Sequence, residues 1–329
     1  MNQPLVDKIV QAVLYEGYIL YPYRPSVKNH CRWTFGGVYP RAYVEANPGA
    51  DLWTMQSQCI VSDADHAEIS VKIRFLHLMQ RTTEPGGQAW QEAVEREVSL
   101  EPALVTDLCD QPRAHPFSFP HHLKSEQEAE KTIVREQQSI RGMIEFSARR
   151  MSDGIFQATV RIENKTSLDA RDSQDRDQAL MRSFASTHTI LNVTRGEFIS
   201  LTDPPPPLAG IANQCRNIGC WPVLVGAPGE KDTLLASPII LYDYPQIAPE
   251  SPGDLFDGTE IDEILSLRIM TLTDEEKRQG AATDDRVRQM LSRTESLARD
   301  ELMNLHGVLR GMSSLNTVEP HVLSPEQSP

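Results

Sequence analysis

The sequence predicts a β-rich α+β protein with an antiparallel, sandwich-like core, a short N-terminal helix and a small helical C-terminal region. Three observations favour this fold class. Segments between about residues 54 and 245 alternate polar and apolar residues, no regular alternation of strands with helices runs through them, and helical spacing appears only near the two ends. Period-two alternation is typical of antiparallel sheets with one solvated face.

The clearest strand patterns lie at residues 68–76 and 154–163. Residues 133–163 have the pattern of a hairpin, since two alternating runs flank the turn sequence MSDG. Further strand candidates are residues 133–149, 183–193 and 234–242. In contrast, residues 110–131 combine prolines, histidines and charges, and residues 203–208 are proline-rich, so both are expected to be surface connections.

The two ends of the chain have helical signals. Residues 4–16 carry one apolar stripe and end before Gly17, a typical C-terminal stop. Near the other end, Asp257-x-x-Glu260 and Thr273-x-x-Glu276 match the capping box of helix starts. The expected organisation is an N-terminal helix and loop (1–50), a sandwich-like domain (51–250), a helical region (254–311) and a disordered tail (312–329).

The composition predicts which classes of partner are disfavoured and in which compartment the protein is found. The net charge is −14 and the pI is near 5.1, so nucleic acids and anionic membranes are disfavoured as partners. The N-terminus lacks the basic region of a signal peptide, and no apolar run is long enough to span a membrane. Five cysteines, an odd number, fit reduced thiols better than a disulfide framework. These features together predict a cytoplasmic protein.

No catalytic motif is recognisable in the chain. It contains no G-x-G-x-x-G, G-x-S-x-G, H-E-x-x-H or kinase signature. Residues 226–233 resemble a phosphate-binding loop only superficially, because strand-like residues follow where a helix is required; a hairpin turn is the better interpretation. The sequence therefore favours a non-catalytic protein without a cofactor.

One cysteine pair leaves a metal-binding alternative open. Cys215 and Cys220 could hold a soft metal if a further ligand such as Cys31 joined them. A strong zinc signal would need two such pairs, and the alternative is that both cysteines are buried beside a turn near Trp221. A metal carrier or an enzyme that uses Cys215 and Cys220 is the corresponding alternative function.

The segment Tyr18–Pro40 differs from the rest of the chain, because it contains six aromatic residues, several cations and no acid. Aromatic residues and arginine are enriched at binding hot spots. The alternative is that the aromatic residues close the open end of the sheet and the cations pair with acidic helices. The partner-binding surface predicted from this segment and the C-terminal helices comprises Tyr21, Tyr23, Arg24, Lys28, Arg32, Trp33, Phe35, Tyr39, Glu260, Asp262 and Glu263.

Two stretches, YPYRPSVKNHCRWTFGGVYP (21–40) and LFDGTEIDEILSLRIMTLTDEEKRQG (255–280), resemble proteins encoded beside the actinobacterial-type, oxygen-insensitive [NiFe] hydrogenases. The resemblance implies an accessory protein that assists assembly, maturation or stabilisation of such a hydrogenase. Its expected partner is a hydrogenase subunit or a maturation factor. Another interpretation is a self-assembling scaffold, that is, a homo-oligomer.

Overall fold

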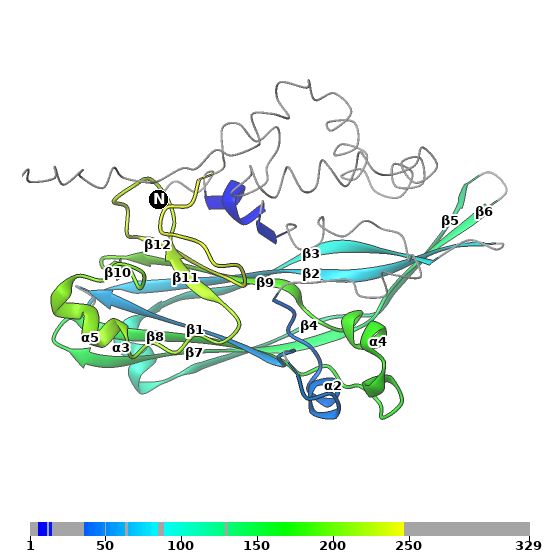
Figure 1. Ribbon diagram of the computed structural model, residues 1–329, viewed down its shortest axis with the longest axis horizontal. Helices are drawn as coiled ribbons and strands as arrows, with labels where there is room; N and C mark the ends of the chain where they lie inside the picture. The colour runs from blue at the N-terminus through cyan, green and yellow to red at the C-terminus, as the bar shows by residue number, and fades with distance from the viewer. Residues whose placement is uncertain are drawn as a thin grey trace, which may run out of the picture.

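The computed structural model describes residues 6–11, 13–14, 36–49, 51–62, 65–84, 89–128 and 131–246, apart from the side chains of residues 89, 90 and 128. Within this part, two antiparallel sheets face each other as the layers of a β-sandwich (Figure 1). The helices that lie between strands along the chain are short. The predicted β-rich fold class is therefore confirmed for the described residues.

The first sheet has five strands in the order β10–β1–β8–β7–β4. Their bounds are Thr54–Ser62 (β1), Arg113–Phe119 (β4), Ile140–Ser152 (β7), Ile155–Asn164 (β8) and Glu197–Ile199 (β10). The hairpin predicted around MSDG is present as β7 and β8. Gly154 in its turn has a φ of 67°, in the left-handed region that glycine adopts without strain.

The second sheet contains seven strands, with β11–β12–β9–β2–β6–β5 along one path and β3 paired to β2. Their bounds are Glu68–Glu84 (β2), Ala89–Leu104 (β3), His122–Glu128 (β5), Lys131–Gln137 (β6), Ala185–Thr194 (β9), Trp221–Leu224 (β11) and Thr233–Ser237 (β12). β2 pairs with β9 through its first half and with β6 through its last residues. The β5–β6 hairpin consequently extends beyond the first sheet, at the right of Figure 1.

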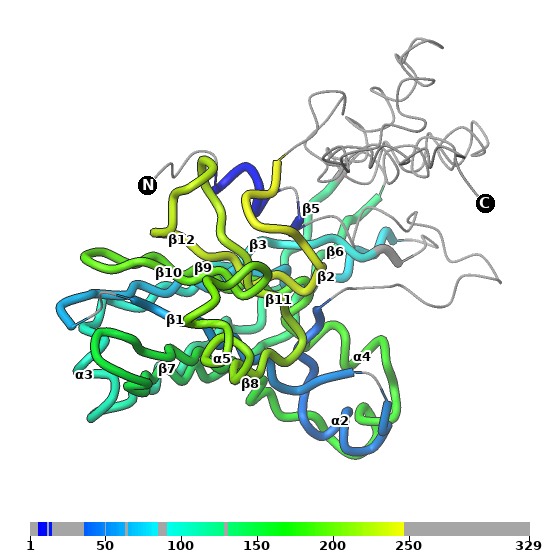
Figure 2. Tube along the Cα trace, turned by 60° about the vertical axis from the view of Figure 1, so that its left-hand side comes forward, coloured from blue at the N-terminus to red at the C-terminus, as the bar shows by residue number. Residues whose placement is uncertain are grey.

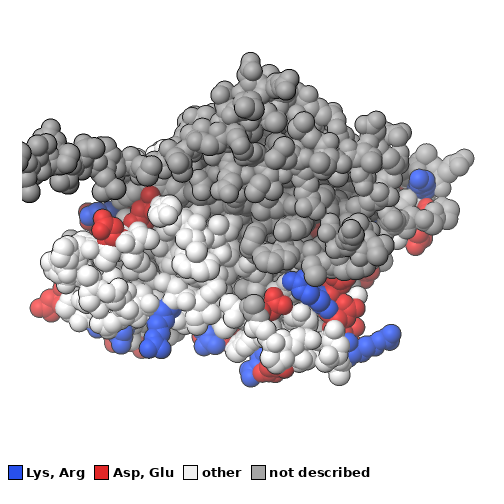
Figure 3. Space-filling view, in the orientation of Figure 1, with Lys and Arg blue, Asp and Glu red and all other residues white. Residues whose placement is uncertain are grey.

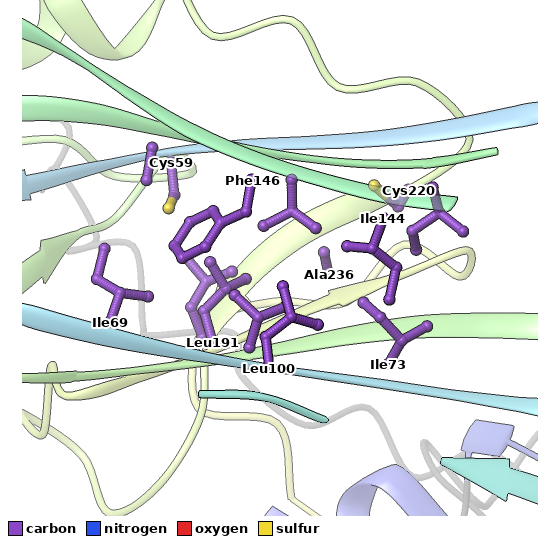
Figure 4. Close-up of a cluster of buried hydrophobic side chains, with 14 of the residues drawn as sticks. Cys59, Ile69, Ile73, Leu100, Ile144, Phe146, Leu191, Cys220 and Ala236 are labelled. Carbon is purple, nitrogen blue, oxygen red and sulfur yellow. The ribbon is translucent and has the colours of Figure 1, made fainter. Parts of the chain in front are cut away.

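The main core lies between the two sheets. In β2, alternate residues Ile69, Val71, Ile73 and Phe75 are buried, while the residues between them are less so, as period-two alternation predicts. Side chains from the first sheet, such as Phe146, meet them from the other side (Figure 4). Burial of these apolar side chains is the main stabilising contribution to the sandwich.

The N-terminal helix covers the outer face of the second sheet. Residues 6–11 and 13–14 are helical, which confirms the helix predicted there. Its apolar stripe, which includes Ile9 and Val13, packs against Ile190 and Leu235 of the sheet. The polar side of the helix is tied to the same sheet, because Gln11 bonds to the Glu95 carboxylate at 2.7 Å.

Short helices fill the ends of the sandwich. They are α2 (Arg41–Ala46), α3 (Val105–Asp110), α4 (Arg176–Leu180), α5 (Ala209–Ala212) and the 3-10 turns η1 (Asp172–Gln174) and η2 (Pro206–Leu208). α2 and α4 lie at the same end (Figures 1 and 2). Buried Asn164 joins this end to the sandwich, since its Nδ2 atom donates to the carbonyl oxygens of Val38 and Arg182.

Two sequence-based expectations are corrected by the structure, and one strand was missed. Residues 110–131 are not a connection but contain β4 and β5, whose polar side chains are exposed at sheet edges. Residues 133–149 belong to two strands, β6 and β7. The long strand β3 was not predicted from the sequence. The helices predicted in 254–311 and the tail lie outside the described residues.

Candidate functional site

Most of the predicted partner-binding surface lies outside the described residues. This applies to Tyr21, Tyr23, Arg24, Lys28, Arg32, Trp33, Phe35, Glu260, Asp262 and Glu263. Tyr39 is described, and only 1% of it is exposed. Its ring packs against Tyr43 with the centroids 5.3 Å apart, and its hydroxyl accepts a 3.0 Å hydrogen bond from Arg176. Tyr39 is therefore a packing residue, which corrects its assignment as a contact residue for a partner.

The chain enters and leaves residues 15–35 beside the same part of the second sheet. Leu14 packs against Leu76 and Ala185. On the other side of the segment, the carbonyl oxygen of Gly36 accepts a hydrogen bond of 3.1 Å from the amide of Thr187. The described residues on the two sides of 15–35, Leu14 and Gly36, thus both lie close to the start of β9.

The predicted metal ligands do not form a metal site within the described residues. Cys220 is buried, its thiol donates to the carbonyl oxygen of Gln56 at 3.2 Å, and burial raises its pKa to about 12. Burial also raises the pKa of half-buried Cys215, whose sulfur accepts from Gln157. Cys31 lies outside the described residues, so its participation stays a prediction.

The same absence applies to other side chains that bind metals. No group of three or more His, Cys, Asp or Glu side chains converges to hold an ion within the described ranges. The cysteines in these ranges are all free thiols. Cys220 lies in the main core (Figure 4), whereas Cys215 is half-buried.

A different surface stands out by its exposed apolar side chains. Of the five large hydrophobic side chains that are exposed among the described residues, four come from one stretch of 25 residues: Ile218, Trp221, Ile240 and Tyr242, with exposed fractions of 39%, 46%, 69% and 83%. We call these four residues the apolar patch. Exposed apolar residues that gather in one place mark binding surfaces more often than scattered ones do.

Strand pairing brings Trp221 and the segment that carries Ile240 and Tyr242 to the same strand. Trp221 is opposite Ser237, and three residues further along β11 the carbonyl of Leu224 accepts from the amide of Tyr244 at 2.7 Å. The chain from 238 to 243 therefore passes from beside Trp221 to beside Leu224, a distance of about 10 Å along the strand. Ile240 and Tyr242 consequently lie in the segment that returns alongside β11, and Ile218 lies three residues before Trp221 in the chain.

Alternation within this returning segment decides which side chains are exposed. Leu241 is buried in the cluster under the N-terminal helix, and Ile239 packs against that cluster. Their neighbours Ile240 and Tyr242 point the other way and stay exposed. The N-terminal helix thereby helps to fix the patch from behind.

Hydrogen bonds to Asp243 fix the backbone next to Tyr242 of the patch. Its carboxylate accepts hydrogen bonds from Ser200 Oγ at 2.5 Å, Thr202 Oγ1 at 2.7 Å and the Leu224 amide at 2.8 Å. The next residue, Tyr244, has a φ of 56°, a conformation that costs a non-glycine residue free energy and persists only where neighbours impose it. The returning segment is therefore a fixed part of the fold.

Figure 3 shows a mostly uncharged described surface at the left of the view, with Asp and Glu at its left edge and upper rim and Lys and Arg along its lower rim. An exposed Trp and an exposed Tyr on a rigid backbone are suited to binding another macromolecule, whose contact would bury both rings. The sequence signal was the continuous apolar run Ile239–Tyr242, but only the fold shows which of these side chains reach solvent.

Comparison with known proteins adds no family. The chain matches no protein-family model and no curated protein. Among the described residues, none of the helices has the length and apolar character required to cross a membrane.

Proposed function

We propose that this chain is a non-catalytic accessory protein that binds a protein partner through the apolar patch. The observation that carries the proposal is the position of Trp221 and Tyr242, exposed by 46% and 83% on a backbone held by Asp243. Tryptophan and tyrosine supply much of the binding free energy at protein interfaces, since they bury a large area with little loss of side-chain entropy.

The partner that we propose is a [NiFe] hydrogenase subunit or a maturation factor of such a hydrogenase. This part of the proposal is supported by the resemblance of residues 21–40 and 255–280 to hydrogenase-associated proteins. We also propose a cytoplasmic location, for which the free thiols of the described cysteines are the supporting observation.

The test is capture of the partner from native cells, followed by mass spectrometry. Replacing Trp221 and Tyr242 together by alanine should abolish capture and leave the melting temperature within a few degrees of the wild type, because both side chains are exposed. The matched control is Leu123→Ala, which removes another exposed apolar side chain, 59% exposed, from β5. Undiminished capture by the double variant would rule out the patch as the binding surface.

Further outcomes separate the parts of the proposal. Recovery of a hydrogenase subunit or maturation factor supports the assigned partner, whereas a deletion strain with fully assembled, active hydrogenase contradicts it. The molar mass in solution distinguishes the scaffold interpretation. A homo-oligomer that dissociates in the double variant would mean that the patch joins copies of this chain, and the accessory function would then be rejected.

A further inference from the structure

The feature of interest lies between the sheets where β2 and β3 continue toward the β5–β6 hairpin (Figure 1). There β2 contributes His77, β3 contributes Arg96 and β6 contributes Gln137. Phe75 of β2 is directly opposite Arg96, so His77, two residues further on, is the diagonal neighbour of Arg96 on the same face. Diagonal residues of paired strands are close enough for long side chains to interact.

His77 is a buried polar side chain whose ring nitrogens lack partners. It is fully buried, and neither Nδ1 nor Nε2 has a hydrogen bond of normal geometry within the described ranges. Burial and the nearby charge of Arg96 lower its pKa to about 4, which the backbone of Gln138 partly opposes. The imidazole is therefore neutral near pH 7, and apart from the Gln138 backbone no polar group of the described residues hydrogen-bonds to its ring nitrogens. Buried polar atoms of this kind are rare and call for a physical explanation.

Arg96 beside it is a cation without an acidic partner. Its Nη2 atom donates to Gln137 Oε1 at 2.8 Å, but its Nε atom is buried without a partner. No carboxylate pairs with it among the residues that the structure describes. Burial accordingly lowers the pKa of Arg96.

Other arginines of the same sheet are paired differently. Arg74 meets Glu95 at 3.0 Å, and Arg135 meets Glu92 at 2.9 Å. In a chain with a net charge of −14, carboxylates are abundant, yet none is placed beside Arg96 in the described part. A half-buried guanidinium with no carboxylate beside it in the described part is suited to bind a carboxylate through charge-assisted hydrogen bonds.

Gln137 fixes the geometry of the pair. It is buried, its Oε1 accepts from Arg96, and its Nε2 donates to the carbonyl oxygen of His77 at 3.1 Å. One amide thus bridges the backbone of His77 to the Arg96 guanidinium. Because both ends of the amide are used, Gln137 is not itself the missing partner of the Arg96 Nε atom.

An aromatic wall adjoins the two polar groups. The Arg96 guanidinium lies 4.6 Å from the ring centroid of Phe119, and the His77 ring lies 6.4 Å from it. Phe117 and Phe75 continue the wall, each with its centroid about 6 Å from that of Phe119. Phe117 and Phe119 remain partly exposed, so the wall is accessible from solvent.

We propose that Arg96 and His77, with the wall formed by Phe75, Phe117 and Phe119, bind a small organic carboxylate that carries an aromatic or apolar group. The carboxylate would accept from the Arg96 Nε–H and from an imidazole N–H, and the apolar group would cover the exposed edges of Phe117 and Phe119. This arrangement supplies partners for the unsatisfied atoms and follows the usual composition of small-molecule sites, which are mostly apolar with a few convergent polar groups. The site does not depend on the apolar patch.

The test uses phenylacetate as the probe and phenylacetamide, its neutral counterpart, as the ligand control. Phenylacetate should bind saturably to the full chain in a calorimetric titration, and the amide should bind at least tenfold more weakly. Arg96→Gln should weaken phenylacetate binding at least tenfold. The matched control is Arg141→Gln, which removes an exposed arginine from β7 and should leave binding unchanged.

A second measurement on the wild type covers the case in which Arg96→Gln fails to fold. The side-chain nuclear magnetic resonance signals of His77 should shift on titration with phenylacetate, while those of exposed His66 should not. Absence of saturable binding, equal binding of the amide, or an unmoved His77 signal would each overturn the proposal. Binding of sulfate or chloride alone would mean that the site takes inorganic anions, and would also overturn it.

Discussion

The carboxylate of Asp243 accepts a hydrogen bond of 2.8 Å from the backbone amide of Leu224, a buried residue of β11. The same carboxylate binds the hydroxyl groups of Ser200 and Thr202. One side chain therefore connects the end of β10, strand β11 and the segment that returns past the apolar patch.

We expect Asp243→Ala to lower the free energy of unfolding by about 1–3 kcal/mol, because the buried Leu224 amide loses its acceptor. Urea unfolding measures the change. The control is Asp203→Ala, which removes an exposed carboxylate from the neighbouring loop and should change stability by less than about 0.5 kcal/mol. Equal losses in the two variants would mean that the Asp243 carboxylate has no special structural role.

The buried histidines predict a loss of stability in mild acid. His188 is fully buried, its Nδ1 lies 2.8 Å from the carbonyl oxygen of Ser186, and burial lowers its pKa from 6.5 to about 4. The pKa of His77 is lowered to a similar value. Between pH 6.5 and about 4 the unfolded chain binds more protons than the folded one, so the stabilisation is complete above pH 6.5 and decreases as the pH falls through this window.

Each histidine should contribute at most about 1.4 kcal/mol per pH unit in that window. Urea unfolding at about pH 7 and about pH 5 measures the slope. His188→Gln should reduce it, whereas changing exposed His66 to Gln should not. A slope that is identical in wild type and His188→Gln would contradict the assigned titration.

The close packing of Phe117 against Gly142 predicts that a side chain at position 142 destabilises the first sheet. A Cβ atom at Gly142 would lie 2.1 Å from the Cζ atom of Phe117, so Gly142→Ala should destabilise the protein by about 1–3 kcal/mol. The loss should be smaller in a Phe117→Ala background, because the clash is then absent. Gly210→Ala is the matched control, since nothing lies within 4 Å of its added Cβ, and it should be neutral or slightly stabilising.

The cysteines should differ in their reactivity toward iodoacetamide. Buried Cys59 and Cys220 have raised pKa values, and they should be protected in the native state, whereas half-buried Cys215 should react earlier. Peptide mass spectrometry after timed labelling measures the order, and labelling in urea should remove it. Joint protection of Cys215 and Cys220 by added zinc would favour the metal-carrier alternative instead.

Strands whose side chains alternate between core and solvent were predicted well from the sequence. The runs predicted at 68–76 and 154–163 correspond to β2 and β8. They could be predicted because a strand that is buried on one face produces period-two alternation in its sequence. Strands with little burial were missed. β4 and β5 are edge strands with mostly exposed side chains, and β3 is rich in acids that pair with β2, as Glu95 does with Arg74.

The candidate sites were less predictable than the strands. Trp221 and Tyr242 are 21 residues apart in the chain, and both lie along β11 only because the segment after β12 returns beside this strand. His77 and Arg96 come from different strands, and an unsatisfied nitrogen can be recognised only when all its neighbours are known. The prediction for Tyr39 failed in the opposite direction. This aromatic residue of a basic segment was expected to contact a partner, but it is buried.

The sequence by itself determined the class of the fold, the N-terminal helix and the main hairpin, because these depend on local periodicity and on turn residues such as Gly154. Tertiary structure decided the pairing of β3 and β5, the exposure of the apolar patch and the position of Arg96, which no carboxylate of the described residues pairs with. These properties depend on contacts between residues far apart in the chain, and on which atoms remain without a partner after folding. Neither can be inferred from local sequence patterns.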